Sequence, residues 1–337
     1  MVGMASLAKE MSTYSIIIPV YNRPAEVREL LESLTHQTCT DFEVVIIEDG
    51  STVCCDDVVK AYETLLDIRY FSKPNSGRSL TRNYGMERAS GKYLVFFDSD
   101  CIIPPDYFQK VTDCLDKTKA DCYGGPDKAH QSFTLMQKAI NYSMTSFLTT
   151  GGIRGSRKGL ETFTPRTFNM GFSQDVYRKV GGFKDMYGED IDLSIRIREA
   201  GFMVTLFPDA FVYHKRRVNL RSFYKQVYVF GMARVLLYRL HPGSLKLVHL
   251  LPALFVAGTA VLLLSSLLCL WALLPLGVYM LALFTESLCV NKRLPIALLS
   301  IVTGFIQLIG YGNGFISAFI RQADMEESLK KHYKKKA

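Results

Sequence analysis

The chain has 337 residues, with 40 Lys and Arg against 32 Asp and Glu, and 48% of its residues are hydrophobic. This length predicts one large domain or two modest ones. The positive charge is concentrated at 215–246 and at the C-terminal end, and both clusters flank apolar segments. That position favours anionic lipid headgroups on a cytoplasmic membrane face, and because no nucleic-acid motif is present, a nucleic-acid partner is not expected.

The N-terminal residues 1–13 contain no long apolar run, so we expect a short extension and not a signal peptide. The eight cysteines lack the paired spacing of zinc sites. We therefore expect reduced thiols in a cytosolic or membrane setting.

Residues 14–217 are expected to form an α/β domain with a mostly parallel sheet. Short apolar runs alternate there with segments of helical periodicity, as they do in right-handed βαβ units. Strands are predicted at 14–20, 42–47, 68–71 and 93–97, and helices at 24–37, 56–66 and 79–89.

Polar residues follow three of these strands where each strand ends. They are Tyr21-Asn22, Asp49-Gly50-Ser51 and Asp98-Ser99-Asp100. Because ligands of parallel α/β sheets bind beyond the carboxyl ends of the strands, the three clusters predict one binding site. Alternation along a strand points Asp98 and Asp100 the same way, and a divalent cation with diphosphate oxygens would favour that pair. A polar turn is the alternative for this tripeptide alone.

The second half of the domain has weaker signals. Residues 123–165 are expected to be less regular, and the Gly-rich basic stretch 149–159 is expected to be a mobile, solvated connection rather than a phosphate lid. A helix is predicted at 174–180, and Glu189, Asp190 and Asp192 are expected to open a second helix that ends near Gly201. Short strands are predicted at 204–207 and 210–213, with His214 at the end of the second.

The C-terminal third predicts contact with a membrane. The basic and aromatic segment 218–247 has the pattern of an interfacial helix. The apolar region 248–320 is long enough for two spans, placed at 248–270 and 272–290. The element at 294–320 has a stripe of small and polar residues, and it is either a third span or a re-entrant or interfacial helix. We favour the latter because a third crossing would place the basic tail 321–337 outside, against the positive-inside rule.

Six motifs, taken in order, resemble those of the family 2 glycosyltransferases of the GT-A fold. They are Ile18-Pro19-Val20-Tyr21-Asn22-Arg23, Glu48-Asp49-Gly50-Ser51, Gly77-Arg78-Ser79-Leu80-Thr81-Arg82-Asn83-Tyr84-Gly85, Asp98-Ser99-Asp100, Gly181-Gly182-Phe183 and Glu189-Asp190-Ile191-Asp192-Leu193. The resemblance covers about residues 14–215 and implies a Rossmann-like catalytic domain that binds a UDP- or GDP-sugar. The apolar C-terminal part is more loosely similar to the membrane anchors of members that act on lipid-linked acceptors.

The resemblance implies a nucleotide-sugar site. Asp49 would accept hydrogen bonds from the base or ribose, and Asp98 would hold the ribose or lie near the metal. Arg82 would face the diphosphate or nucleotide, and a plain surface position is its alternative. The implied site comprises Pro19, Tyr21, Asn22, Asp49, Ser51, Arg82, Asp98 and Ser99.

The resemblance also implies a metal site and a catalytic base. Asp100, with Asp98 and His214, would bind Mn²⁺ or Mg²⁺, which neutralises a departing diphosphate; a structural role is the alternative for His214. Asp190 would take the proton of an acceptor hydroxyl during an inverting attack, with Glu189 as the alternative base. Arg196 would orient this acidic pair or be an ordinary helix-surface charge.

These roles predict transfer of a single sugar to a membrane acceptor at the cytoplasmic face. The expected acceptor is an undecaprenyl-diphosphate-linked saccharide, and a polyprenyl phosphate, as used by dolichol-phosphate-mannose synthases, is the alternative. Polymerisation is disfavoured because Gln226 does not begin the Gln-x-x-Arg-Trp motif of processive synthases, and Trp271 lies in an apolar segment. A catalytically inactive membrane scaffold is a further alternative, which the retained acidic pairs disfavour.

Overall fold

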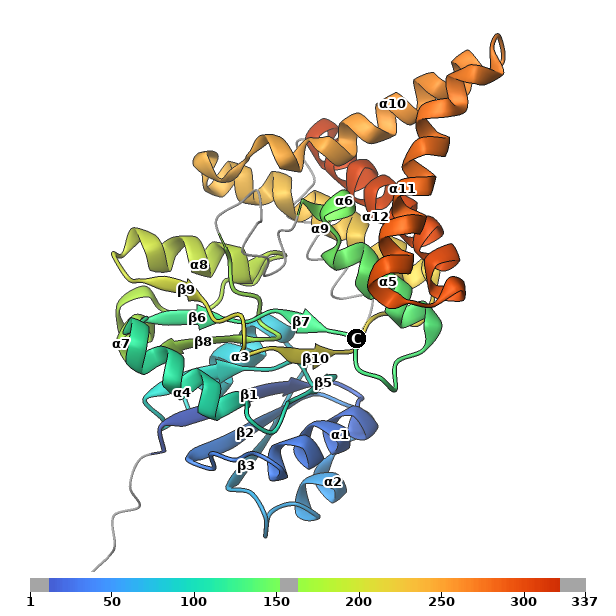
Figure 1. Cartoon of the computed structure of the whole chain (residues 1–337). Coiled ribbons are helices and arrows are strands. Elements are labelled where there is room, and N and C mark those ends of the chain that lie inside the picture. Colours follow the sequence, from blue (N-terminus) through green and yellow to red (C-terminus); the bar gives the residue numbers. More distant parts are fainter. Residues whose placement is uncertain (1–11, 152–162, 322–337) are drawn as a thin grey trace, which may run out of the picture.

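A computed structural model describes residues 12–151 and 163–321 (Figure 1). A sheet-based domain forms one part of the molecule, and long helices from the C-terminal third lie across one end of it. Residues 322–337 of the basic tail, residues 152–159 of the Gly-rich basic stretch and residues 1–11 of the N-terminal extension lie outside the described residues.

A seven-stranded sheet forms the centre of the domain, in the order β3-β2-β1-β4-β8-β6-β9. All neighbouring strands pair in parallel except β8, which is antiparallel to both β4 and β6. The predicted mostly parallel α/β sheet is therefore confirmed. The strands are β1 (Tyr14–Val20), β2 (Phe42–Asp49), β3 (Ile68–Lys73), β4 (Tyr93–Phe96), β6 (Cys122–Gly124), β8 (Met170–Ser173) and β9 (Val204–Leu206).

Helices cover both faces of this sheet. Alternate side chains of β1 and β2 enter two separate apolar clusters, as the two-residue period of a strand requires. Ile16 and Ile18 pack with one set of helices, and Ile17 packs with the other. The first set is α1 (Pro24–Thr35), α2 (Asp56–Lys60) and α4 (Tyr107–Thr118), and the second is α3 (Arg78–Met86), α7 (Gln174–Val180) and α8 (Glu189–Glu199).

A small second sheet determines where His214 lies. Its order is β5-β10-β7, with β5 at Cys101–Ile102, β7 at Asp127–Lys128 and β10 at Val212–His214. His214 is paired with Cys101, the residue after Asp100. This pairing brings a histidine from late in the domain to the carboxyl end of β4, which sequence periodicity could not indicate.

Two local predictions were wrong. The helix expected at 56–66 ends at Lys60 and is followed by turns. The segment expected to be irregular contains α5 (Leu135–Thr145) and the short α6 (Phe147–Thr150). Thr134 and Gln137 form a reciprocal capping box at the start of α5, a signal that was present in the sequence and was missed.

The C-terminal third is helical, as predicted. It consists of α9 (Leu220–Leu240), α10 (Leu251–Ser266), α11 (Leu274–Asn291) and α12 (Leu294–Ile320), with 3₁₀ turns at Pro242–Ser244, Leu247–His249 and Leu270–Leu273. By length and apolar composition, Leu270–Asn291 and Leu294–Ile320 could each cross a membrane, whereas α10 has 16 residues and is shorter than the span expected at 248–270.

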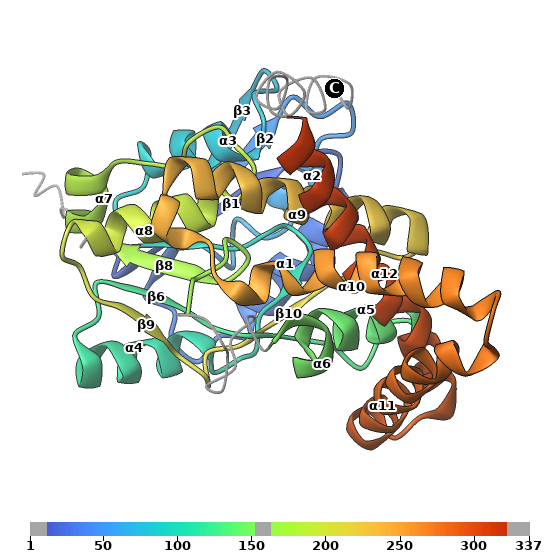
Figure 2. The ribbon, with the colours of Figure 1, turned by 90° about the horizontal axis from the view of Figure 1, so that it is seen from above.

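The small-residue stripe of α12 packs against other helices. A Cβ added at Gly314 would lie 1.9 Å from the carbonyl oxygen of Tyr228 on α9. Thr303 hydrogen-bonds Ser143 at 2.6 Å and the carbonyl oxygen of Ala139 at 3.1 Å, both on α5. The apolar face of α9 is therefore covered by α12, and Figure 2 shows α12 running across the top of the molecule beside α9 and α5.

Candidate functional site

The carboxyl end of β4 carries the acidic pair, as predicted. Asp100 Oδ2 accepts a hydrogen bond from Arg23 Nη1 at 2.7 Å, and Asp100 Oδ1 lies 3.3 Å from His214 Nε2. The same nitrogen lies 3.8 Å from Asp98 Oδ2. The structure thus brings together the three side chains expected to bind a metal.

Asp100 and His214 shift each other's pKa. Burial acts to raise the pKa of Asp100, but His214 and Arg23 outweigh it and hold that pKa well below its usual range. Burial acts to lower the pKa of His214, but hydrogen bonding to Asp100 and Asp127 outweighs it and raises that pKa to about 9. Each of these two groups therefore favours the charged form of the other.

The donor atoms of Asp100, Cys101 and His214 lie within 4.8 Å of one another. Oδ1 of Asp100 is buried and faces His214 Nε2 across 3.3 Å, so a cation at this point would be within reach of both side chains. The Cys101 thiol belongs to the apolar core and donates to the carbonyl oxygen of Phe168 at 3.6 Å, and thiolate is a poor ligand for Mn²⁺ or Mg²⁺, so we do not count it as a ligand. Two carboxylates and an imidazole fit Mn²⁺ or Mg²⁺.

Arg82 is buried and is not a surface residue, so that alternative is wrong. Its guanidinium group donates to Asp98 Oδ1 at 2.7 Å through Nη2 and to Glu189 Oε1 at 3.2 Å through Nη1. It also lies over the ring of Phe183, 5.8 Å from the ring centroid. Arg82 therefore connects the acidic pair after β4 to the acidic start of α8.

The two candidate bases at the start of α8 have different surroundings. Glu189 is buried and binds both Arg82 and Arg78, with Arg78 Nη2 at 3.0 Å from Oε2. Asp190 is partly exposed; its Oδ1 accepts from the Ile191 amide at 2.8 Å and lies 3.6 Å from Arg166 Nη1. Asp190 is thus less strongly held by cations than Glu189.

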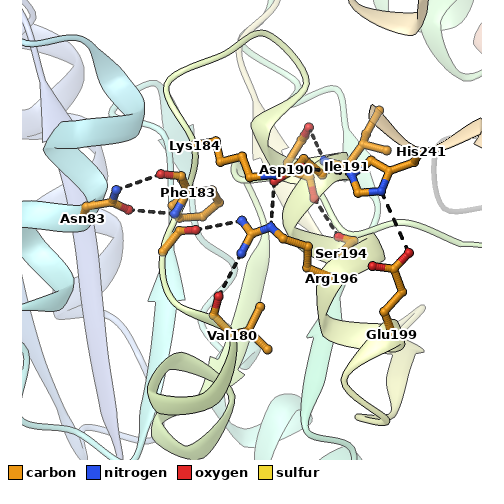
Figure 3. A network of polar contacts seen from close by, with 12 residues as sticks. Asn83, Val180, Phe183, Lys184, Asp190, Ile191, Ser194, Arg196, Glu199 and His241 are labelled. Carbon is orange, nitrogen blue, oxygen red and sulfur yellow. Dashed lines mark hydrogen bonds and ion pairs between the residues drawn. The ribbon is translucent and has the colours of Figure 1, made fainter. Parts of the chain in front are cut away.

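Arg196 contacts neither Glu189 nor Asp190. It donates to Asp192 Oδ2 at 2.8 Å and to the carbonyl oxygens of Val180 and Gly182 (Figure 3). Neither sequence interpretation of Arg196 was correct, because this arginine fixes the Gly181-Gly182 turn.

Asp192 is fully buried among cations. It binds Arg196, Lys184 at 3.0 Å and His241 Nε2 at 2.9 Å. Burial acts to raise the pKa of Asp192, but His241, Arg196 and Lys184 outweigh it and lower that pKa. Because His241 follows α9, this carboxylate joins the sheet domain to the C-terminal helices.

The turn after β1 is fixed by the turn after β2. Asn22 has a positive φ of 53°, and its side-chain oxygen accepts from the amides of Thr52 and Val53 at 2.8 and 2.9 Å. The Asn22 amide donates to Ser51 Oγ at 2.7 Å. Pro19 pairs in register with Ile47, so the predicted residues at these two strand ends are adjacent.

Asp49 holds the loop before α3. Its carboxylate accepts from the amides of Ser76 and Gly77 at 2.9 and 3.0 Å and pairs with Lys73. Gly50 has a φ of +71°, and an added Cβ there would lie 2.6 Å from the backbone nitrogen of Asn75. Asp49 therefore lies at the predicted edge of the sheet, where it already has three donors.

Sequence reasoning missed the residues behind His214. Asp127 Oδ2 lies 3.8 Å from His214 Nδ1 and pairs with buried Arg216. Arg216 in turn donates to Asn141 Oδ1 of α5 at 3.0 and 3.1 Å. Asp127 is in β7, which pairs with β10, and no motif marked it.

With this geometry in place, comparisons with known proteins identify the class. The glycosyl transferase family 2 model matches residues 15–181. Glycosyltransferase AglE of Haloferax volcanii is 26% identical over 261 residues, which is 72% of this chain and 80% of that protein. An uncharacterized glycosyltransferase of Rickettsia bellii is 44% identical over 98 residues, which is 29% of this chain and 14% of that protein.

The fold is shared with a solved structure. Mannosyltransferase PcManGT from Pyrobaculum calidifontis, solved in complex with GDP-Man and Mn²⁺, has a TM-score of 0.59 to this chain at 15% identity. The likeness covers 93% of this chain and 89% of the mannosyltransferase. At that identity it supports the GT-A fold and no more.

The sheet domain is thus a glycosyltransferase domain with the GT-A fold, as the motifs predicted. The chain belongs to glycosyl transferase family 2 through this domain. It spans between 14% and 28% of the length of three curated relatives that it matches.

Proposed function

We propose that the protein is an inverting, metal-dependent glycosyltransferase that takes one sugar from a nucleotide-sugar. The observation that carries this proposal is the cluster of Asp98, Asp100 and His214 at the carboxyl end of β4. A complex of PcManGT with GDP-Man and Mn²⁺ supports this class of donor and cation.

The nucleotide-sugar would lie along the edge formed by β1, β2 and β4. Pro19, Tyr21, Asn22, Asp49 and Ser51 line the first two strand ends, and Ser99 lies between the two acids. A Mn²⁺ or Mg²⁺ held by Asp100, Asp98 and His214 would supply the positive charge that stabilises the departing diphosphate. Arg23, 2.7 Å from Asp100, would add a fixed cation beside it.

Asp190 is the proposed base. A general base must accept a proton, and Glu189, with two arginines on its carboxylate, is the weaker acceptor. Asp190 would take the hydroxyl proton of the acceptor while that oxygen attacks the anomeric carbon opposite the diphosphate. The carbon–oxygen bond to the diphosphate breaks as the new one forms, which inverts the configuration.

The proposed acceptor is a lipid-linked saccharide, such as one on undecaprenyl diphosphate, at the cytoplasmic face of a membrane. The exposed apolar side chains of α10 and α11 support a membrane location. A polyprenyl phosphate is the second candidate, and in that case Asp190 would position a phosphate that needs no strong base.

The test measures nucleoside diphosphate released from a panel of UDP- and GDP-sugars, with Mn²⁺ or Mg²⁺ and a bacterial lipid extract. We expect Asp190→Asn to lower the turnover by about 10² to 10⁴-fold, the usual contribution of a general base. Asp100→Ala should lose the response to added metal. Asp175→Asn, which changes an exposed carboxylate of α7, is the matched control.

Unchanged release in Asp190→Asn and Asp100→Ala would contradict the mechanism. Absence of release with every donor in the panel would favour the inactive scaffold. Mass spectrometry of the lipid product separates the two acceptors, because one product carries a new glycosidic bond and the other a sugar phosphate.

A further inference from the structure

The hairpin formed by α10 and α11 exposes an apolar surface. At its tip, Leu267, Leu268 and Trp271 are 81%, 94% and 79% exposed. This tip projects away from the rest of the molecule in Figures 1 and 2. Such a continuous apolar surface marks contact with a membrane or another apolar partner.

The free part of the hairpin is short. Phe255 of α10 and Tyr279 of α11 both contact Phe305 of α12, with ring centroids 5.6 and 5.8 Å away, so both helices are still docked at this level. Beyond it, 259–266 and 270–278 rise about 12 Å and about 14 Å at about 1.5 Å per residue. A bilayer core is about 30 Å thick, so the free part reaches through roughly one leaflet.

The helix α12 is long enough to cross a bilayer, but it is docked on α5 of the sheet domain and on α9. Near its middle, Thr303 bonds Ser143 of α5. Further on, added Cβ atoms at Gly310 and Gly314 would lie 2.4 Å from Val227 and 1.9 Å from Tyr228 of α9. A helix in contact with α5 of the sheet domain and with the basic helix α9 cannot cross a bilayer unless both of those helices enter the membrane too.

The charges of α9 oppose such an entry. Arg221, Lys225 and Arg239 of α9 are exposed, and taking them into hydrocarbon beside α12 is strongly unfavourable. Exposed Lys246, Lys292 and Arg293 lie at the two ends of the α10–α11 hairpin.

The segment 241–320 contains very little negative charge to offset these basic residues. Glu286 is the sole acid from 241 to 320, and it accepts hydrogen bonds from Tyr142 and Ser146, each at 2.5 Å. The base of the hairpin is therefore positive, which matches anionic lipid headgroups.

We infer that this protein binds one leaflet of an anionic bilayer as a monotopic anchor. The free part of the α10–α11 hairpin inserts through about the thickness of this leaflet. The helix α12 lies at the headgroup level, with both of its ends on the side of the sheet domain. This arrangement deepens the membrane location in the proposed function but does not depend on sugar transfer. In this arrangement, the two spans expected at 248–270 and 272–290 are replaced by one hairpin that enters a single leaflet.

The single tryptophan of the chain, Trp271, is a native probe of depth. The full-length protein is added to phosphatidylcholine–phosphatidylglycerol vesicles containing lipids brominated near the headgroup, at mid-chain or at the chain end. We expect a blue-shifted emission of Trp271 and the strongest quenching by bromines between the middle and the end of the lipid acyl chain. Iodide on either side of the membrane should cause no quenching. Quenching by iodide trapped inside the vesicles would show a crossing hairpin and overturn the proposal.

The position of α12 is tested in Trp271→Phe by adding Leu298→Trp or Phe319→Trp, two exposed positions near opposite ends of α12. Both reporters should show headgroup-level quenching and accessibility to iodide from outside. A reporter reached only by internal iodide would mean that α12 crosses, which overturns the inference.

Vesicle sedimentation tests whether lipid covers the apolar surface of the hairpin. Leu268→Glu with Trp271→Glu should weaken binding to anionic vesicles at least tenfold, whereas Leu65→Glu, a matched change at an exposed leucine after α2, should not. If the double variant binds the vesicles normally, the hairpin does not insert into lipid and the inference is wrong. Because no sugar is present, this result is independent of the transferase test.

Discussion

At the edge of the sheet, buried and partly buried carboxylates lie against guanidinium and imidazole groups, whereas in the C-terminal helices the one acid lies against hydroxyl groups. Asp100, Glu189 and Asp192 each contact two or more cationic groups. Glu286 instead contacts Tyr142 and Ser146. Charged groups are thus concentrated at the sheet edge, whereas α10, α11 and α12 contain few of them, and an isolated buried charge there would be costly.

The packing also differs between the two regions. In the sheet domain, large side chains such as Phe96, Phe108 and Phe172 fill the space between layers. In the helical region, Gly231, Gly310 and Gly314 allow the backbones of α9 and α12 to approach closely. Glycine is required at these positions because a Cβ there would clash with the facing helix.

The largest expected effect tests the charged side of this comparison. Asp192→Asn should destabilise the fold by about 3 kcal/mol at neutral pH, because Arg196, Lys184 and His241 lose a buried counter-charge. The folded pKa of Asp192 is lowered, so its contribution is complete above the unfolded pKa of about 4 and is lost as pH falls below it. The denaturant midpoints of the unmodified protein and of Asp192→Asn should therefore converge at low pH, and Asp175→Asn serves as the control.

The next effect concerns the residue behind His214. Asp127→Asn should weaken Mn²⁺ binding by about 10 to 100-fold, because groups that position a metal ligand typically contribute this much. Titration calorimetry with Mn²⁺ measures it, and Asp113→Asn, on the exposed side of α4, serves as the control. If affinity stays unchanged while the thermal midpoint falls, Asp127 is a structural partner of Arg216 alone.

On the apolar side, a glycine contact should respond to volume. Gly314→Ala should lower stability in detergent by about 2 kcal/mol, since the added methyl group would lie 1.9 Å from the Tyr228 carbonyl oxygen. Gly258→Ala has no atom within 4 Å of the new Cβ and should be neutral or slightly stabilising. Equal thermal midpoints for the two variants would contradict the packing of α9 on α12.

The smallest expected effect concerns Glu286, which is held, within the described part of the chain, by hydroxyl groups and not by cations. Tyr142→Phe should cost about 1 kcal/mol, because Ser146 still donates to Glu286 when one hydroxyl is lost. Tyr142→Phe with Ser146→Ala should cost more than the sum of the single changes, as measured in a double-mutant cycle of thermal midpoints. An additive result would mean that Glu286 finds another donor.

The sequence predicted the strands that bear the site with good accuracy. Apolar runs defined β1, β2 and β4, and the polar residues after them lie at one edge as expected. It did not predict the partners of those residues. Asp49 is held by amides of a loop 27 and 28 residues later, and Arg82 reaches Glu189 across 107 residues. Such contacts depend on strand order and helix packing, which periodicity does not encode.

The sequence by itself determined the fold class, the family motifs and the apolar nature of the C-terminal third, because these follow from local patterns of polarity and spacing. Only the tertiary structure decided that β10 places His214 beside Asp100, that Arg82 is buried, and that α12 is docked on α5 and α9. Each of these depends on contacts between segments distant in the chain. An apolar helix of 27 residues meets the length for a span, and only its neighbours show that it lies against the domain.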